Sequence, residues 1–259
     1  MKITLIGAGN VGYHLGQRLH KKGFTIVQVF SRTLEKAERL ATKIGASAVH
    51  KISAISATSD IYMLAVKDDA IEKVSRQLAT VLDSHKKLVV HTSGAASSLT
   101  IAKYFQNYGV FYPLQTFSIT RPVKFSTIPI CLAARRKKDQ KLLLKIAKKI
   151  SKKVAFVSDE ERAILHVAAV FVNNFSNHLF HVGHSILSKE RIDLDLLKPL
   201  ILETVLKIEE GTPFAMQTGP AKRGDTQTIK KHLDYLQKFP KYGQLYTLIT
   251  KSIQDAYRR

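Results

Sequence analysis

The first half of the chain alternates between short apolar runs and longer segments in which apolar residues recur every three to four positions. Short apolar runs are typical of buried strands, and the longer spacing is typical of amphipathic helices. Strands that alternate with helices in this way indicate βαβ units and a parallel sheet. The predicted strands are residues 2–6, 24–30, 47–49, 60–66, 87–92, 109–113, 126–134 and 154–158, and the predicted helices between them are residues 10–22, 34–44, 69–82, 99–105 and 138–153.

The strand signal ends at Ser158. Residues 159–259 have helical spacing almost throughout, and only short polar turns interrupt it. The sequence has neither internal repeats nor a low-complexity linker. We therefore expect two domains, an α/β domain over residues 1–158 and an all-α domain over residues 159–259.

A glycine-rich turn follows the first predicted strand. Its sequence, GAGNVG, is the pattern G-x-G-x-x-G with a strand before it and a helix after it. In that setting the glycines allow a tight turn and a close approach of the backbone to a pyrophosphate, and the helix N-terminus attracts the phosphates. The turn therefore predicts a Rossmann domain that binds a dinucleotide. The candidate cofactor-binding residues are Gly7, Gly9, Asn10, Val11 and Gly12.

The second predicted strand ends in Ser31, Arg32 and Thr33, and no carboxylate precedes Glu35. In NAD-binding units an acidic side chain at this place accepts a hydrogen bond from the ribose 2′-hydroxyl. An acid would repel a 2′-phosphate, whereas a guanidinium pairs with a phosphate through two hydrogen bonds. These three residues therefore predict NADP as the cofactor. The alternative, that Arg32 is a solvated loop residue, stays open.

Polar residues also follow two later strands of the first domain. Ligands of open parallel sheets bind outside the carboxyl ends of the strands. Ser93 and Gly94, which follow the strand at residues 87–92, are therefore further candidates for cofactor binding. Gln115 and Thr116, after the next strand, are candidates for lining the same cleft.

The first long helix of the second domain carries a polar stripe. The sequence LHVAAVFVNNFSNHLFHVGH is apolar enough for a central buried helix, yet His166, Asn173, Asn177 and His184 fall within a narrow arc at about 100° per residue. Buried polar groups need partners, because an unsatisfied one costs about 1–3 kcal/mol. Either these residues bond to other helices, or they line a cleft and bind substrate.

The string TGPAKRGD, residues 218–225, lies between two predicted helices. Its glycines and proline predict a tight turn. Arg223 suits a substrate carboxylate, and Asp225 is positioned to orient it or to cap the next helix. The two roles of Asp225 are compatible.

The composition of the chain bears on its binding partners and on its cellular compartment. The net charge of +21 predicts attraction to anions, which include nucleic acid, acidic lipid and small phosphorylated or carboxylated molecules. Cys131 is the single cysteine and lies in an apolar run, so we expect it to be buried, in a reducing cytoplasm without disulfides. No apolar run approaches the ~20 residues that a membrane span needs.

The motifs IGAGNVG, HTSGA, YPLQTFS, LHVAAVFVNNFSNHLF and TGPAKRGD together resemble one family. It is the family of Rossmann-like NADP oxidoreductases with a helical C-terminal domain of formerly unknown function. This family is similar in plan to ketopantoate reductases, pyrroline-5-carboxylate reductases and 6-phosphogluconate dehydrogenases. The resemblance covers nearly the whole chain, and it implies a helical domain that forms a homodimer.

The resemblance implies an NADPH-dependent reductase of a small anionic 2-oxo acid, with 2-dehydropantoate favoured, in pantothenate synthesis. Arg223 and Asp225 would serve the carboxylate, Asn173 and Asn177 would bond the reacting group, and His166 would be the general acid. The sequence departs from ketopantoate reductases in one respect. Those enzymes carry a lysine early in the first long helix, and here no lysine precedes Lys189 in that helix.

Two alternatives stay open. One is an imine reductase of the pyrroline-5-carboxylate type. The other is a non-catalytic protein that senses NADP or binds nucleic acid, which the ten basic residues within residues 135–153 favour. No aromatic platform or helix-turn-helix pattern accompanies them, so nucleic acid is not the expected partner. No metal site is expected.

Overall fold

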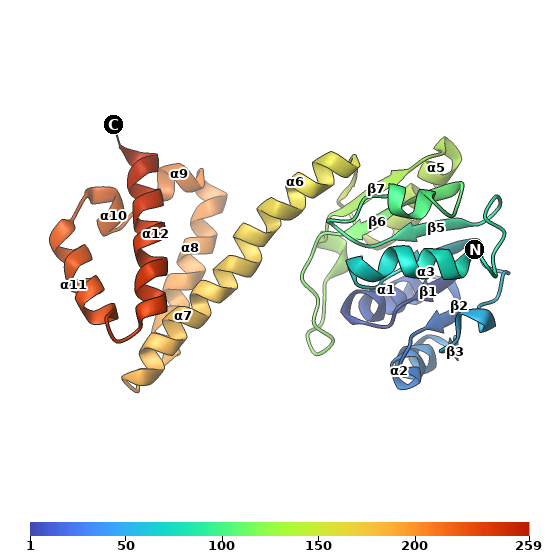
Figure 1. The fold of residues 1–259 in the computed structure, drawn as a ribbon, viewed down its shortest axis with the longest axis horizontal. Coiled ribbons are helices and arrows are strands. Elements are labelled where there is room, and N and C mark those ends of the chain that lie inside the picture. Colours follow the sequence, from blue (N-terminus) through green and yellow to red (C-terminus); the bar gives the residue numbers. More distant parts are fainter. Residues whose placement is uncertain (259) are drawn as a thin grey trace. The chain divides into compact units, whose positions relative to one another are not determined.

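The computed structural model describes residues 1–258, and the chain divides into two compact units between Asn173 and Asn174. The first unit is an eight-stranded sheet flanked by helices (Figure 1). Its strands are β1 (Lys2–Ile6), β2 (Thr25–Phe30), β3 (Ser47–Val49), β4 (Ile61–Leu64), β5 (Leu88–His91), β6 (Asn107–Pro113), β7 (Ile130–Ala134) and β8 (Val154–Phe156). Its helices are α1 (Asn10–Lys21), α2 (Leu34–Ile44), α3 (Ile71–Leu78), α4 (Leu99–Ala102), α5 (Lys137–Ile150) and α6 (Asp159–Ala169).

The strands lie in the order β3-β2-β1-β4-β5-β6-β7-β8. The parallel Rossmann sheet that the sequence predicts is confirmed for β1 to β6 and for the pair β7–β8, but β7 is antiparallel to β6. The connection between β6 and β7 explains this difference. It contains only a 3-10 turn, Phe125–Thr127, whereas a parallel pair requires a crossover, which is usually a helix.

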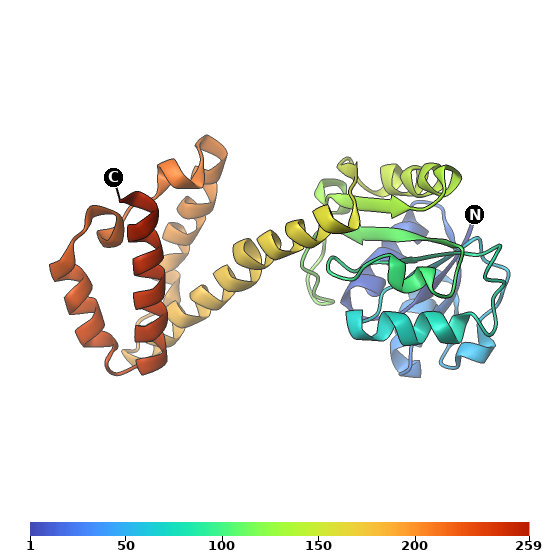
Figure 2. The ribbon, with the colours of Figure 1, turned by 45° about the horizontal axis from the view of Figure 1, so that its top comes forward.

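The core of the first unit lies on both faces of this sheet, and helices cover each face (Figure 2). Side chains alternate along β1, so that Ile3 and Leu5 pack with α1, α2 and α5, whereas Ile6 packs with α3 and α4. All three are fully buried. Cys131 on β7 is also buried, as the sequence predicts. The packing of these buried side chains therefore fixes the positions of the strand ends and of the turns that follow them.

The helical part of the chain begins where the sequence pattern changes. Ser158 caps α6 in a capping box, since its hydroxyl accepts from the Glu161 N–H at 3.1 Å and its own N–H donates to the Glu161 carboxylate at 2.7 Å. Helix α6 continues into a π-helical segment, Val170–Phe175. The boundary between the compact units falls inside this segment, beyond the expected position at residue 158. Helix α6 therefore belongs to the first unit.

The second unit is entirely helical. Its helices are α7 (Ser176–Lys189), α8 (Lys198–Glu210), α9 (Pro213–Met216), α10 (Pro220–Arg223), α11 (Thr226–Leu236) and α12 (Pro240–Tyr257), with a 3-10 turn at Leu194–Leu197. A cavity of about 260 Å³, lined mainly by apolar side chains of α7 and α12, lies within it. Among the described residues no helix is long and apolar enough to cross a membrane.

Helix α8 is apolar and largely uncovered in a single copy of the chain. The side chains of Leu200, Leu202, Val205, Leu206 and Ile208 are each more than half exposed, and we call these five residues the α8 face. Exposed apolar residues also follow the α6–α7 run, so the sequence-based expectation of a buried first helix is wrong for one copy of the chain. Exposed apolar surface of this kind is typical of surfaces that bind other proteins.

Candidate active site

The turn after β1 leaves no room for side chains at two of its glycines. Gly7 has φ +117°, and a Cβ there would lie 2.2 Å from the carbonyl oxygen of Ala65. A Cβ on Gly12 would lie 2.0 Å from the carbonyl oxygen of Gly7. A Cβ on Gly9, in contrast, would meet nothing within 4 Å. The turn therefore packs tightly against β4 and leaves open space where the motif brings its backbone to a phosphate.

Helix α1 begins directly after this turn, with Gly9 as its N-cap. None of the described side chains caps this end, and its first turn carries no acid. The backbone N–H groups of Asn10 and Val11 therefore keep their capacity to bind an anion, and the helix dipole adds a positive field. These residues fit the pyrophosphate of a dinucleotide.

The end of β2 is polar and exposed. Arg32 and Thr33 are exposed, Ser31 is half-buried, and the Thr33 N–H donates to the Ser31 hydroxyl at 3.3 Å. Thr33 is the N-cap of α2, so the three residues form the turn between β2 and α2. A guanidinium at this turn is accessible to a 2′-phosphate.

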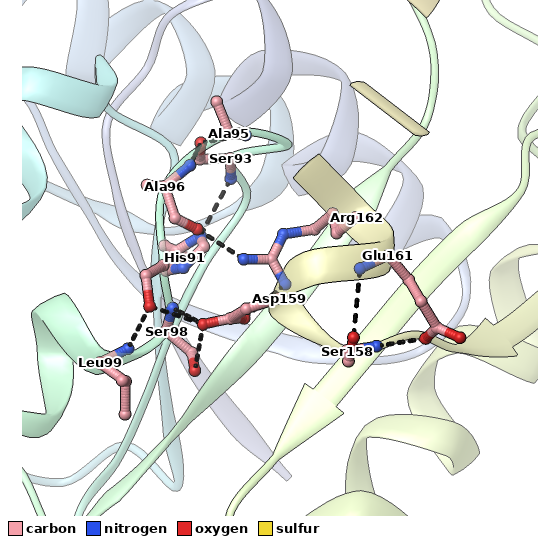
Figure 3. A network of polar contacts seen from close by, with 11 residues as sticks. His91, Ser93, Ala95, Ala96, Ser98, Leu99, Ser158, Asp159, Glu161 and Arg162 are labelled. Atoms are coloured by element: carbon pink, nitrogen blue, oxygen red, sulfur yellow. Dashed lines mark hydrogen bonds and ion pairs between the residues drawn. The ribbon is translucent and has the colours of Figure 1, made fainter. Parts of the chain in front are cut away.

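The loop after β5 is held by its own side chains (Figure 3). The Ser93 N–H donates to His91 Nδ1 at 3.1 Å, and the Ser93 hydroxyl accepts from the N–H groups of Ala95 and Ala96 at 3.1 and 2.9 Å. The side chain and backbone of Ser93, a residue predicted to bind the cofactor, thus shape the loop. Gly94 lies at its bend.

Two charged residues of α6 fasten this loop (Figure 3). Arg162 is fully buried, and it donates to Asp159 Oδ1 at 2.8 Å and to the Ala96 carbonyl at 2.5 Å. Asp159 Oδ2 accepts from the Ser97 hydroxyl at 2.6 Å and from the Ser98 N–H at 2.7 Å. Burial raises the pKa of Asp159, but the hydrogen bonds from Ser97, Arg162 and Ser98 outweigh burial and hold this pKa below its ordinary value. The ionised pair therefore fixes the loop after β5 to α6.

His91 lies under this loop at the end of β5 and is fully buried. Burial, and then the nearby positive charge of Arg162, lowers the pKa of His91 to about 4. The imidazole is therefore neutral at neutral pH, with Nδ1 as an acceptor for the Ser93 N–H.

His166 of α6 lies at the same edge of the sheet. Its Nδ1 is 3.5 Å from the hydroxyl of Tyr112, the next-to-last residue of β6. A Cβ on Gly94 would lie 2.6 Å from His166 Nδ1 and 2.8 Å from the Tyr112 hydroxyl. The structure therefore brings together three segments, namely the loop after β5, the end of β6, and α6.

The π-helical segment changes the polar stripe that the sequence predicts. Asn173 lies inside this segment, where i→i+5 hydrogen bonds replace the α-helical pattern. Residues beyond it, such as Asn177, no longer keep the α-helical register with His166. The prediction of one uniform arc is therefore wrong, because it assumed 3.6 residues per turn throughout. Segments of this kind often occur at functional sites.

The remaining predicted site residues belong to the second unit. Asn177 lies on α7, and Arg223 ends α10. Asp225 caps α11, since its carboxylate accepts from the Thr228 N–H at 3.0 Å and from the Thr228 hydroxyl at 2.8 Å. The capping role of Asp225 is confirmed, and within residues 1–258 no ion pair joins it to Arg223. Within the same range, no cluster of His, Cys, Asp or Glu could hold a metal ion.

Sequence reasoning missed Tyr112, His91, Asp159 and Arg162 as individual site residues. Tyr112 and His91 stand at the ends of predicted strands, where a search for side chains at the carboxyl edge would have found them. Asp159 and Arg162 carry a weaker signal, an acid and a base three positions apart directly after a capping serine.

Two family models match parts of the chain. Residues 2–94 match a family described as NADP oxidoreductase coenzyme F420-dependent, and residues 128–253 match a domain of unknown function, DUF2520. No curated protein matches the chain in sequence.

Solved structures resemble the whole chain. A candidate NADP oxidoreductase from Bacteroides fragilis is 38% identical, with 98% of each chain covered and a TM-score of 0.93. An imine reductase from Myxococcus stipitatus in complex with NADP⁺ is 17% identical, with 99% of this chain and 94% of that chain covered and a TM-score of 0.69. A pyrroline-5-carboxylate reductase from Coxiella burnetii is 18% identical, with 99% and 98% covered and a TM-score of 0.57. At these low identities the last two show a shared fold.

Proposed function

Because this chain belongs to the family of NADP oxidoreductases that includes the Bacteroides fragilis protein, we propose that it is an NADPH-dependent reductase of a small anionic substrate with a carbon–nitrogen double bond. The family confirms NADP as the cofactor that the sequence predicts. When bound, NADPH supplies a hydride to the substrate carbon. The residues of this chain bind the cofactor, orient the substrate and provide a proton.

The choice of a carbon–nitrogen bond is supported by the acid groups of the site. Reduction of a 2-oxo acid needs a strong proton donor for the developing alkoxide, whereas an imine nitrogen takes up a proton far more readily. The α6–α7 run has no lysine before Lys189, and its half-buried His166 is a weaker electrostatic partner for an alkoxide than a lysine. An imine reductase and a pyrroline-5-carboxylate reductase share the fold.

We keep 2-dehydropantoate as the second candidate substrate, because the sequence resemblance favours it. Both candidates are small and anionic, and in both cases Arg223 would bind the carboxylate while Asn173 and Asn177 would hydrogen-bond the reacting group. The test is the rate of NADPH oxidation with pyrroline-5-carboxylate, with 2-dehydropantoate and with a panel of 2-oxo acids. Turnover of the imine alone supports the proposal, turnover of 2-dehydropantoate alone supports the second candidate, and turnover of none refutes both.

The single observation that carries NADP recognition is the accessible guanidinium of Arg32 at the end of β2, where NAD-binding units place an acid. Replacing Arg32 by Ala removes a charged hydrogen bond, and we expect NADPH to bind about 10- to 100-fold more weakly, with NADH unaffected. Arg76→Ala, the same change on the exposed side of α3, is the matched control. Equal losses for both cofactors would contradict the role of Arg32.

We also propose that a second copy of the chain covers the α8 face. Five exposed apolar side chains on one short helix would not stay in water in a stable monomer. Sedimentation should give the mass of a dimer, and Leu206→Glu should lower the dimer affinity. Lys230→Glu, a charge change at an exposed position of α11, is the control. A wild-type monomer at micromolar concentration would refute this proposal.

A further inference from the structure

Tyr112 is a titratable group at the candidate active site that the proposed function leaves without a role. Its hydroxyl lies 3.5 Å from His166 Nδ1, at the long end of hydrogen-bonding distance. The two rings meet edge to face, with centroids 6.4 Å apart and an interplanar angle of 68°. The hydroxyl of Tyr112 and the imidazole of His166 therefore form a pair.

The position of this pair is fixed by packing. The Tyr112 ring packs in a small cluster with Val110, Cys131 and Leu165. On its other side, a Cβ on Gly94 would clash with both the Tyr112 hydroxyl and His166 Nδ1. The loop that carries Gly94 is in turn fastened to α6 through Asp159 and Arg162, as described above. The pair thus has little freedom to move apart.

The pair also stands on the side of the sheet where reduction would occur. A dinucleotide on a Rossmann sheet crosses the carboxyl edge with its pyrophosphate at the turn after β1. Arg32 marks the adenosine side, at the end of β2. Strands β4, β5 and β6 lie on the other side of β1, so the nicotinamide half of a bound dinucleotide would extend toward the ends of β5 and β6. Tyr112 is the next-to-last residue of β6.

We propose that the Tyr112 hydroxyl is the proton donor of the reduction and that His166 returns a proton to it. This inference rests on the proposed function. As hydride reaches the substrate carbon, the Tyr112 O–H bond breaks and a bond forms between that proton and the substrate nitrogen. The phenolate then takes the proton from Nδ1 of His166, and the half-buried imidazole takes up a proton from the solvent at Nε2.

The chemical state of Tyr112 suits a donor. Burial raises the pKa of Tyr112 above its ordinary value, so the phenol keeps its proton at neutral pH until the substrate takes it. His166 alone, with its Nδ1 turned toward Tyr112, would act on the substrate less directly.

The test compares Tyr112→Phe with Tyr108→Phe, which makes the same change on β6 at the opposite edge of the sheet. With the imine substrate, Tyr112→Phe should lower kcat about 100-fold or more, because a positioned general acid contributes at least this much. NADPH affinity and the melting temperature should stay unchanged. In the cofactor-free protein, the ¹⁵N resonance of His166 Nδ1 should shift in Tyr112→Phe and not in Tyr108→Phe.

The outcomes separate the two proposals. Wild-type turnover with unchanged kcat in Tyr112→Phe would overturn the role of Tyr112 and leave the reductase function standing. Absence of wild-type turnover with every imine and 2-oxo acid would overturn the proposed function, and this inference with it. An unshifted His166 resonance in Tyr112→Phe would overturn the relay whatever the activity.

Discussion

Acid should destabilise the first unit through one residue, His91. This side chain is fully buried at the end of β5, where its Nδ1 accepts from the Ser93 N–H. Burial first, and the charge of Arg162 second, lowers its pKa from 6.5 to about 4. Protonation of His91 in the folded chain would place a second positive charge beside Arg162, away from water. We therefore expect His91 to stay neutral in the folded chain at pH values at which it is protonated in the unfolded chain.

The sign and the size of the effect follow from these two pKa values. Between them the unfolded chain binds one proton more than the folded chain, so the stability is fully present above pH 6.5 and is lost as the pH falls toward 4. Linkage gives a loss of about 2 kcal/mol in the free energy of unfolding between pH 7 and pH 5, out of about 3 kcal/mol in all. The lowered pKa of Asp159 places its titration below this window.

Urea unfolding at pH 7 and pH 5, followed by circular dichroism, measures this loss, and hydrogen exchange of the β5 amides assigns it to the first unit. His91→Asn removes the titration while its side-chain oxygen can replace Nδ1 as an acceptor. His85→Asn, at an exposed histidine just before β5, is the control. An equal fall in stability for wild type and His91→Asn would refute the reasoning.

Three further predictions concern the same unit. Asp159→Ala leaves the buried Arg162 guanidinium without its counter-charge and should cost about 3–5 kcal/mol in urea unfolding. Arg162→Met should cost less because Asp159 keeps its other hydrogen bonds, and a double variant that costs the sum of both would contradict their coupling. Gly12→Ala should push α1 from the turn and abolish NADPH binding by calorimetry, whereas binding at wild-type affinity would contradict the packing. Gly94→Ala should separate Tyr112 from His166 and lower kcat, and unchanged turnover would count against that contact.

The sequence predicts the features of this fold that depend on neighbouring residues. Apolar runs mark the strands, and the turn at residues 7–12 is recognisable because its glycines stand between a strand and a helix. The direction of β7 was not predictable in the same way. It depends on whether the connection from β6 crosses over the sheet. The pattern of apolar residues in a strand is the same whether the strand runs parallel or antiparallel to its neighbour.

The candidate site is less accessible from sequence because its contacts join distant segments. Asp159 meets Ser97 and Ser98 more than sixty residues away, and no local pattern encodes that meeting. The π-helical segment could not be predicted from the sequence either. A shift of one hydrogen-bond partner leaves the spacing of apolar residues along the chain almost unchanged. His166 was predicted because it belongs to a polar stripe on an apolar helix, whereas Tyr112 resembles any aromatic residue of a strand.

The turn after β1 and the turn after β2 differ in how much change they tolerate. At Gly7 and Gly12 even one added methyl group would collide with backbone atoms, so neither position tolerates a larger residue. Arg32, by contrast, sits on an exposed corner where a substitution displaces nothing. Substitutions confined to the turn after β2 should thus suffice to change the preference between NADP and NAD. The turn after β1, which would bind the diphosphate common to both coenzymes, can stay unchanged.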